Sequence, residues 1–152
     1  MKDRRYKKAI LAGIISGCFL GFFLKVIETI TSLKVYTLLL NVDYIPWINR
    51  FRLSESIEFG FHLIVSILLS LFLVKFLTTK EWESKRKITL VVVVCITIAL
   101  LLFPITALST RTPALNNYSA LFYWLLGHAL YGLLLGYLLN NRLVKTWNHH
   151  IK

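Results

Sequence analysis

Four long apolar runs set the pattern of hydrophobic and polar positions along this chain. Each run approaches the roughly 20 residues that a helix needs to cross about 30 Å of hydrocarbon. Inside the runs, the periodicity that a half-wetted helix or strand would show is missing. The pattern therefore predicts four membrane-spanning helices. They cover residues of about 9–30, 57–77, 88–108 and 119–139.

Helices are predicted rather than strands, because open strands leave backbone groups unsatisfied in lipid and barrel strands alternate in short segments. Composition agrees with a membrane protein. The chain is 57% hydrophobic and 16% charged, whereas soluble domains average roughly 45–50% apolar and 25% charged residues. We therefore expect an all-α membrane protein, a four-transmembrane-helix bundle that forms a single polytopic domain over residues 1–152.

The net charge of +11 invites a nucleic-acid interpretation, but most of the cations lie in short segments beside the apolar runs. Three such segments, residues 2–8, 75–87 and 142–152, hold 13 of the 18 Lys and Arg residues. Cation-rich connections stay on the cytoplasmic side of a membrane. We therefore expect both termini in the cytoplasm, a long first loop outside, and no nucleic-acid partner.

The first span has a second interpretation, as a cleaved signal. A basic segment precedes it, and Ile15–Cys18 resembles the lipobox at which bacterial lipoproteins are cut before a lipidated cysteine. The apolar run continues through Phe19–Leu24, however, so an uncleaved anchor is expected. Cys18 and Cys95 lie inside apolar runs without metal-ligand spacing, which predicts no disulfide framework. No cofactor is expected.

Glycines recur every four residues on two of the predicted helices, and such small residues let helix backbones approach closely in lipid. Glu28 has the same azimuth as the first glycine stripe, so its carboxylate is expected inside the bundle. Lys25, three residues earlier, is placed to pair with it. The predicted packing glycines are Gly13, Gly17 and Gly21 on the first helix and Gly132 and Gly136 on the fourth.

The first loop, residues 31–56, contains an apolar segment of interfacial length, Val35–Ile48. Amphipathic aromatic residues favour the headgroup level, and Pro46 would break a helix there. The segment is therefore expected to be partly interfacial, with a re-entrant segment and a plain aromatic loop as the alternatives. Its aromatic residues include Tyr36, Tyr44 and Trp47, and Phe51 follows it.

A stripe of polar residues spaced by four runs along the second span: Glu58, His62, Ser66 and Ser70. Because successive spans alternate in direction, Glu58, His62 and Glu28 all fall in the outer half of the membrane. His128 lies roughly 13 Å below the outer end of the fourth span, at about 1.5 Å per residue. These residues are therefore candidates for one intramembrane polar site in an externally accessible pocket: Glu28, Glu58, His62 and His128.

Ionisable groups at membrane depth are costly, so they often mark a functional site. Two carboxylates and two imidazoles suit a divalent cation such as zinc, or a change of protonation with external pH. The alternative is structural, with carboxylates at the interface and neutral histidines hydrogen-bonded across helices. No Gly-rich phosphate loop, G-x-S-x-G elbow or H-E-x-x-H pair occurs, so no enzymatic activity is predicted. The His149–His150 pair is expected in a solvated tail.

The glycine, glutamate and histidine residues described above follow one another along the chain in an order similar to that in the YagU-like family. This is a family of small bacterial inner-membrane proteins whose activity is not established. The similarity rests on residues 12–17 with Lys25 and Glu28, 61–67, 103–104 with Pro113, and 126–128 with Tyr131. The family's Pro-Pro-Arg element after the first-span glutamate is absent here, and the Lys-to-Glu spacing is one residue shorter. The resemblance implies a bacterial plasma-membrane location and a role for these polar residues: Lys25, Glu28, His62 and His128.

Two functional hypotheses follow from the sequence. In the first, the bundle senses or passes a small ion or proton through the Glu and His residues of its outer half. In the second, it is a non-catalytic scaffold or accessory subunit that assembles through its glycine-rich helix faces. The expected partners are the lipid bilayer and either a second copy of the chain or another membrane protein.

Overall fold

The computed structural model of the chain describes residues 2–42, 45 and 53–147. It is helical, with no strand in these described ranges. In the part of the chain that the structure describes, four helices are long and apolar enough to cross a membrane, which confirms the prediction of four apolar helices of spanning length. The elements are α1 (Lys2–Thr31), α2 (Val35–Leu40), α3 (Glu55–Thr78), α4 (Ser84–Leu102), the 3₁₀ helix η2 (Phe103–Leu108) and α5 (Tyr118–Trp147).

The outer helices extend further than their apolar runs. α1 begins at Lys2 rather than near residue 9, because Lys and Arg are good helix formers and no breaker separates the basic segment from the apolar run. α5 likewise continues past residue 139 to Trp147. The third span changes form near its end: α4 stops at Leu102 and η2 follows, because Pro104 lacks the N–H that an α-helix needs.

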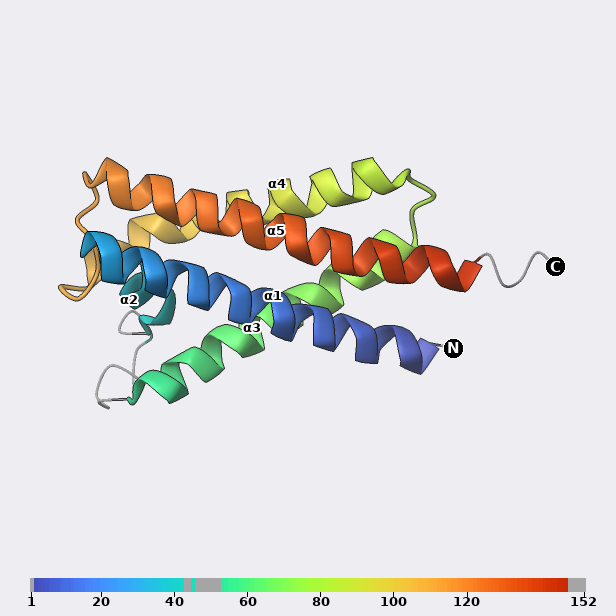
Figure 1. The fold of residues 1–152 in the computed structure, drawn as a ribbon, viewed down its shortest axis with the longest axis horizontal. Helices are drawn as coiled ribbons and strands as arrows, with labels where there is room; N and C mark the ends of the chain where they lie inside the picture. Colours follow the sequence, from blue (N-terminus) through green and yellow to red (C-terminus); the bar gives the residue numbers. More distant parts are fainter. Residues whose placement is uncertain (1, 43–44, 46–52, 148–152) are drawn as a thin grey trace.

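The four long helices run up and down (Figure 1). The N-terminal end of α1, the C-terminal end of α5 and the α3–α4 connection lie at one end of the molecule, and α2 and the α4–α5 connection lie at the other. α1 and α5 form the central pair. α3 packs on α1 and crosses it obliquely, whereas α4 packs on α5. The consecutive helices α3 and α4 are therefore placed on different central helices.

Glycines lie where the long helices approach most closely. A Cβ added at Gly13 of α1 would lie 2.9 Å from the Cα of Ile67 in α3, and one added at Gly132 of α5 would lie 2.9 Å from the Cα of Val92 in α4. Each of these distances is to backbone, which cannot move aside as a flexible side chain can. Gly13 and Gly132 thus leave room for the neighbouring helix.

The polar stripe of α3 is bonded to the backbone of α1. In an α-helix a side chain and the residue four positions on share one face, so two antiparallel helices can match such stripes residue for residue. We call the resulting three hydrogen bonds the α1–α3 ladder. They run from Ser70 Oγ to the Ala9 carbonyl oxygen (2.7 Å), from Ser66 Oγ to that of Gly13 (2.8 Å) and from His62 Nε2 to that of Gly17 (3.1 Å).

The first connection folds back over the end of the bundle. Ser32 follows α1 with a φ of 60°, a left-handed conformation that commonly ends a helix. α2 comes next and contacts α1, α3 and α5, burying Val35 and Leu40. Within the predicted interfacial segment Val35–Ile48, several positions lie outside the described residues. They include Tyr44, Pro46 and Trp47. Phe51 and the pair His149–His150 also lie outside the described residues.

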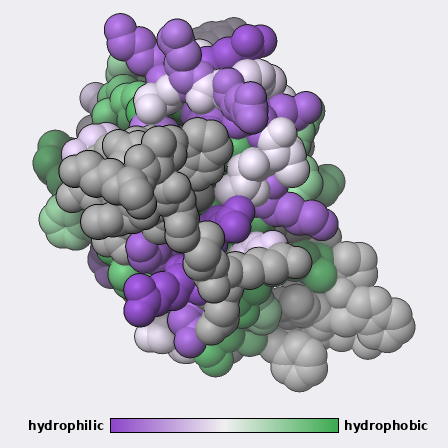
Figure 2. All heavy atoms as spheres, turned by 90° about the vertical axis from the view of Figure 1, so that its right-hand side faces the viewer, coloured by the Kyte–Doolittle hydropathy of each residue, from purple (hydrophilic) through white to green (hydrophobic). Residues whose placement is uncertain are grey.

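The two ends of the molecule differ in charge. Figure 2 looks onto the end that carries the α3–α4 connection, where hydrophilic side chains gather and hydrophobic ones lie around the sides. Trp82 lies in this connection, and the Arg86 guanidinium carbon lies over the Trp82 ring, 4.6 Å from the ring centroid. Exposed cations at this end include Arg4, Lys7, Lys80, Lys85 and Arg86. The opposite end carries the polar pocket described next.

Candidate functional site: a charged pocket at the end of the bundle

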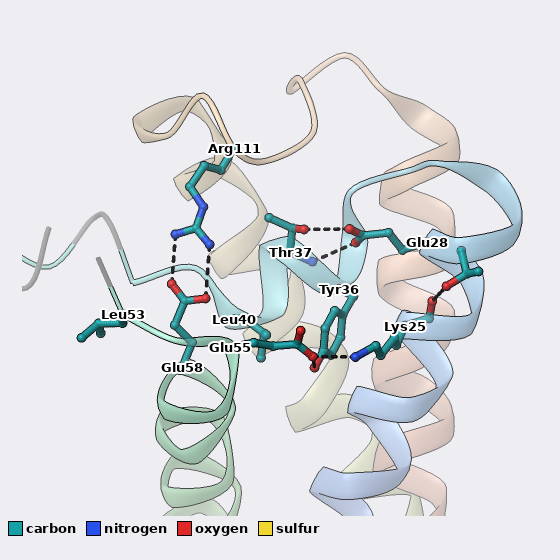
Figure 3. A pocket seen from close by; sticks show the side chains of 10 residues that line it. Lys25, Glu28, Tyr36, Thr37, Leu40, Leu53, Glu55, Glu58 and Arg111 are labelled. Atoms are coloured by element: carbon teal, nitrogen blue, oxygen red, sulfur yellow. Dashed lines mark hydrogen bonds and ion pairs between the residues drawn. The ribbon is translucent and has the colours of Figure 1, made fainter. Parts of the chain in front are cut away.

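A pocket of about 360 Å³ lies at the end of the molecule opposite the α3–α4 connection (Figure 3). Four parts of the chain meet there: the last turns of α1, the short helix α2, the first turn of α3 and the α4–α5 connection. Its lining residues are Lys25, Glu28, Thr29, Tyr36, Thr37, Leu40, Leu53, Glu55, Glu58 and Arg111.

Glu58 and Arg111 join α3 to the α4–α5 connection. The two guanidinium nitrogens donate to the two carboxylate oxygens, Nη1 to Oε1 at 2.9 Å and Nη2 to Oε2 at 3.2 Å. Glu58 is only 4% exposed, and a buried carboxylate needs a counter-charge because its desolvation is costly. Two-point pairing also fixes the direction of the guanidinium. The pair therefore determines where the α4–α5 connection sits on α3.

Glu28 joins α1 to α2. Its Oε2 accepts the backbone N–H of Thr37 (2.8 Å), and its Oε1 accepts the Thr37 hydroxyl (2.7 Å). The reversal of the chain after α1 brings Thr37 back over Glu28, nine residues away. Both carboxylate oxygens are thus engaged by one residue of α2.

Lys25 joins α1 to α3. Its ammonium lies 2.5 Å from Glu55 Oε1, which also accepts the Tyr36 hydroxyl at 2.9 Å. The same ammonium lies 5.1 Å from the centroid of the Tyr36 ring. The prediction that Lys25 pairs with Glu28 is therefore wrong. Glu28 is held by Thr37 instead, and the first turn of α3 presents Glu55 to Lys25.

Tyr36 lies in α2, outside the four candidate spans, and its hydroxyl faces Glu55. Burial raises the pKa of its hydroxyl above the ordinary value of 10.0, and the hydrogen bond to Glu55 and the negative charges of Glu55, Glu28 and Glu58 raise it further. The hydroxyl therefore stays protonated, and keeps donating to Glu55, at a pH where an exposed tyrosine begins to ionise.

The pocket unites only two of the four residues predicted to share it. Glu28 and Glu58 line it, whereas His62 and His128 do not. His62 belongs to the α1–α3 ladder. His128 is 7% exposed and bonds through Nδ1 to the Trp124 carbonyl oxygen at 2.8 Å; its ring centroid lies 4.2 Å from that of Trp124, with the two rings tilted by 52°. Within the described ranges, no group of three or more His, Cys, Asp or Glu side chains is placed to hold a metal ion.

Several lining residues were not predicted as part of the site, among them Thr37, Glu55 and Arg111. Glu55 had a signal in the sequence, because it lies one turn before Glu58 on the same helix, as Lys25 lies one turn before Glu28. Thr37 and Arg111 had none, because each reaches the pocket from a connection whose path depends on how the helices pack.

Among the described residues that line the pocket, the charged side chains sum to a net charge of −1, from three carboxylates (Glu28, Glu55 and Glu58) and two cations (Lys25 and Arg111). A negative pocket between helix ends suits a small cation or a solute that carries a positive group. Comparisons with protein-family models, curated proteins and solved structures find no match for this chain.

Proposed function

We propose that this chain is a small multi-pass membrane protein that senses small charged solutes or ions at the pocket. The observation that carries this proposal is the placement of the charges. Three carboxylates line the cavity, and each bonds to a residue of another element. Glu58 bonds to Arg111, Glu28 to Thr37 and Glu55 to Lys25. A solute that enters the cavity competes with these bonds, and therefore alters how the connected elements hold one another.

Sensing is favoured over passage by the polar residues below the pocket. An ion path would use the stripe of α3, but His62, Ser66 and Ser70 all bond to α1 carbonyl oxygens. These side chains hold two helices together, so they offer little free coordination to a moving ion. We therefore propose that the bundle senses a small ion or solute and does not pass it across the membrane.

Assembly through the glycine faces is the alternative function, and it receives less support. Gly13, Gly17 and Gly21 face residues of α3, and Gly132 and Gly136 face residues of α4. The chain itself occupies these faces. A homo-oligomer or a complex with another membrane protein would use other surfaces.

The proposed setting is the plasma membrane of a bacterium, with both termini and the α3–α4 connection in the cytoplasm. The positive-inside rule supports this orientation, because exposed cations such as Arg4, Lys80 and Arg86 lie at that end. The pocket would then face the outside of the cell. The resemblance to the YagU-like family supports the same location and a role for Lys25 and Glu28.

The amide of Thr37 offers a direct test, because it donates to Glu28 inside the pocket. We would titrate the full chain, in phosphatidylcholine nanodiscs at constant ionic strength, with Na⁺, Mg²⁺ and ethanolamine, and follow the ¹⁵N signal of Thr37. A saturable shift with at least one of them is expected.

The shift is expected to weaken in Glu58→Gln and to persist in Glu81→Gln, a matched change of an exposed carboxylate at the other end of the molecule. No saturable shift with any solute, or an equal shift in Glu58→Gln and the original chain, would contradict the proposal.

A further inference from the structure

We infer that the pocket binds a primary ammonium group, and that Lys25 occupies this ammonium site when no ligand is present. The inference rests on the proposed function and names the class of solute that the pocket takes. It starts from two contacts of a single group, the Lys25 ammonium, and from the cavity that lies beside it.

The surroundings of the Lys25 ammonium are those of an ammonium-binding site. A carboxylate oxygen of Glu55 accepts a hydrogen bond from this ammonium at 2.5 Å. The Tyr36 ring lies 5.1 Å away, within the roughly 6 Å over which a ring face attracts a cation. The Tyr36 hydroxyl donates a second hydrogen bond to the same Glu55 oxygen at 2.9 Å, which helps to hold the carboxylate in place.

Among the charged bonds of the pocket, the one between Lys25 and Glu55 is the easiest to exchange. The side chains of Lys25 and Glu55 are 55% and 58% exposed, whereas the side chain of Glu58 in the pair with Arg111 is 5% exposed. Exposed ion pairs contribute little to stability, so Lys25 can give up its place at small cost. Its long stem then carries the charge into solvent, as lysine stems commonly do.

Size and charge of the pocket agree with an added ammonium. Its volume of about 360 Å³ falls at the lower end of the roughly 300–1,000 Å³ typical of small-molecule sites. The net charge of −1 favours a ligand with a positive group. A trimethylated ammonium has no N–H to donate to the Glu55 carboxylate, as the Lys25 ammonium does, so a primary ammonium is favoured over choline-like groups.

Such an ammonium has two sources, a soluble amine or a lipid headgroup of the phosphoethanolamine type. The pocket lies where α1 ends and α3 begins its span, so both have access to it. The shared chemistry is the primary ammonium, and the source is an outcome of the experiment.

The test is a titration of the full chain in phosphatidylcholine nanodiscs with ethanolamine and with choline, read from the backbone ¹⁵N signal of Tyr36. Ethanolamine is expected to saturate the signal at a concentration at least tenfold below that of choline. Glu55→Gln is expected to raise the apparent Kd for ethanolamine severalfold, and Glu81→Gln is expected to leave it unchanged.

Lys25→Gln supplies the sharpest arm of the test. If Lys25 competes for the site, its removal lowers the apparent Kd for ethanolamine severalfold. A merely structural ion pair predicts the opposite, because losing Lys25 would then harm the site as much as losing Glu55. Both side chains are exposed, so both variants are expected to fold, which gel filtration and circular dichroism check.

Replacing part of the phosphatidylcholine with phosphatidylethanolamine separates the sources. If the lipid is the ligand, the Tyr36 signal starts at its bound position and ethanolamine no longer moves it; if the ligand is a soluble amine, the titration is unchanged. Equal affinity for ethanolamine and choline, or weaker binding in Lys25→Gln, would overturn the inference. Should ethanolamine fail while Na⁺ or Mg²⁺ still shifts Thr37, the proposed function stands without it.

Discussion

Glu58 and Glu55 lie one turn apart on α3, yet their surroundings give them different weights. Glu58 is buried and meets Arg111 through two bonds, whereas Glu55 is more than half exposed. Bonds to a charged group contribute roughly 1.5–3 kcal/mol, whereas an exposed ion pair contributes roughly 0–1 kcal/mol. The two carboxylates therefore form a matched pair for mutagenesis.

Glu58→Gln is expected to lower the free energy of unfolding by about 1–3 kcal/mol, because the amide loses the charge that Arg111 requires. Glu55→Gln is expected to cost less than about 1 kcal/mol. Unfolding with SDS in mixed micelles measures both. An equal loss in the two variants would show that the burial of Glu58 has no energetic effect.

Tyr36 gives the pocket a dependence on alkaline pH. Its pKa is raised in the folded chain, so the folded state keeps a proton that the unfolded state loses above its ordinary value of 10.0. Stability is therefore fully present below that pH and declines as pH rises above it. Tyr36→Phe is expected to make this decline shallower, measured as unfolding free energy against pH in both proteins. Identical slopes would contradict the shift.

At this scale the sequence predicted Glu28 and Glu58 as polar residues at one end of the bundle, but not their partners. Spacing on a helix shows which residues share a face. It does not show that Thr37 and Arg111, which come from connections, lie within bonding distance.

The contact between α1 and α3 has a regular register at the scale of whole helices. In the α1–α3 ladder, each step of four residues along α3 meets a step of four along α1 in the opposite direction. The glycines of α1 allow this approach, because hydroxyl and imidazole groups reach carbonyl oxygens only when the backbones are close. Small residues and polar residues thus act together at this interface.

Gly13→Ala is expected to destabilise the fold by roughly 1–3 kcal/mol, since overpacking at a close contact forces backbone to shift. The added methyl would lie 2.9 Å from the Ile67 Cα. Gly60→Ala on α3 is the matched control, because a Cβ there meets nothing within 4 Å. SDS unfolding is expected to show a loss for the first variant only. Alanine has the higher helix propensity, so a comparable loss in both variants, or no loss in Gly13→Ala, would contradict the packing role of Gly13.

Glu58, His62, Ser66 and Ser70 were predicted as one polar stripe from their spacing, and the structure puts three of them on the backbone of α1. The carbonyl oxygens that accept these hydrogen bonds were not predictable, because every residue has a backbone carbonyl and the sequence does not distinguish one from another. The change from α4 to η2 at Pro104 had a signal, since proline allows a kink or an early stop.

For the molecule as a whole, the four apolar runs were sufficient to predict four antiparallel spans, because hydrocarbon thickness fixes the length of each. The packing order was not predictable. α3 and α4 are joined by a short connection, yet they pack on α1 and α5 respectively. Apolar side chains pack equally well against lipid, so sequence alone does not indicate which faces meet.

The pocket and the α3–α4 connection are expected on opposite sides of the membrane, and labelling of single cysteines in intact cells tests this most directly. Cys18 and Cys95 would first be replaced by alanine, and one cysteine would be placed at Ala114 or at Lys80, both exposed. A membrane-impermeant maleimide is expected to label Ala114→Cys from outside, and Lys80→Cys only after permeabilisation. Labelling of both positions from the same side would contradict the four-span arrangement and the external pocket.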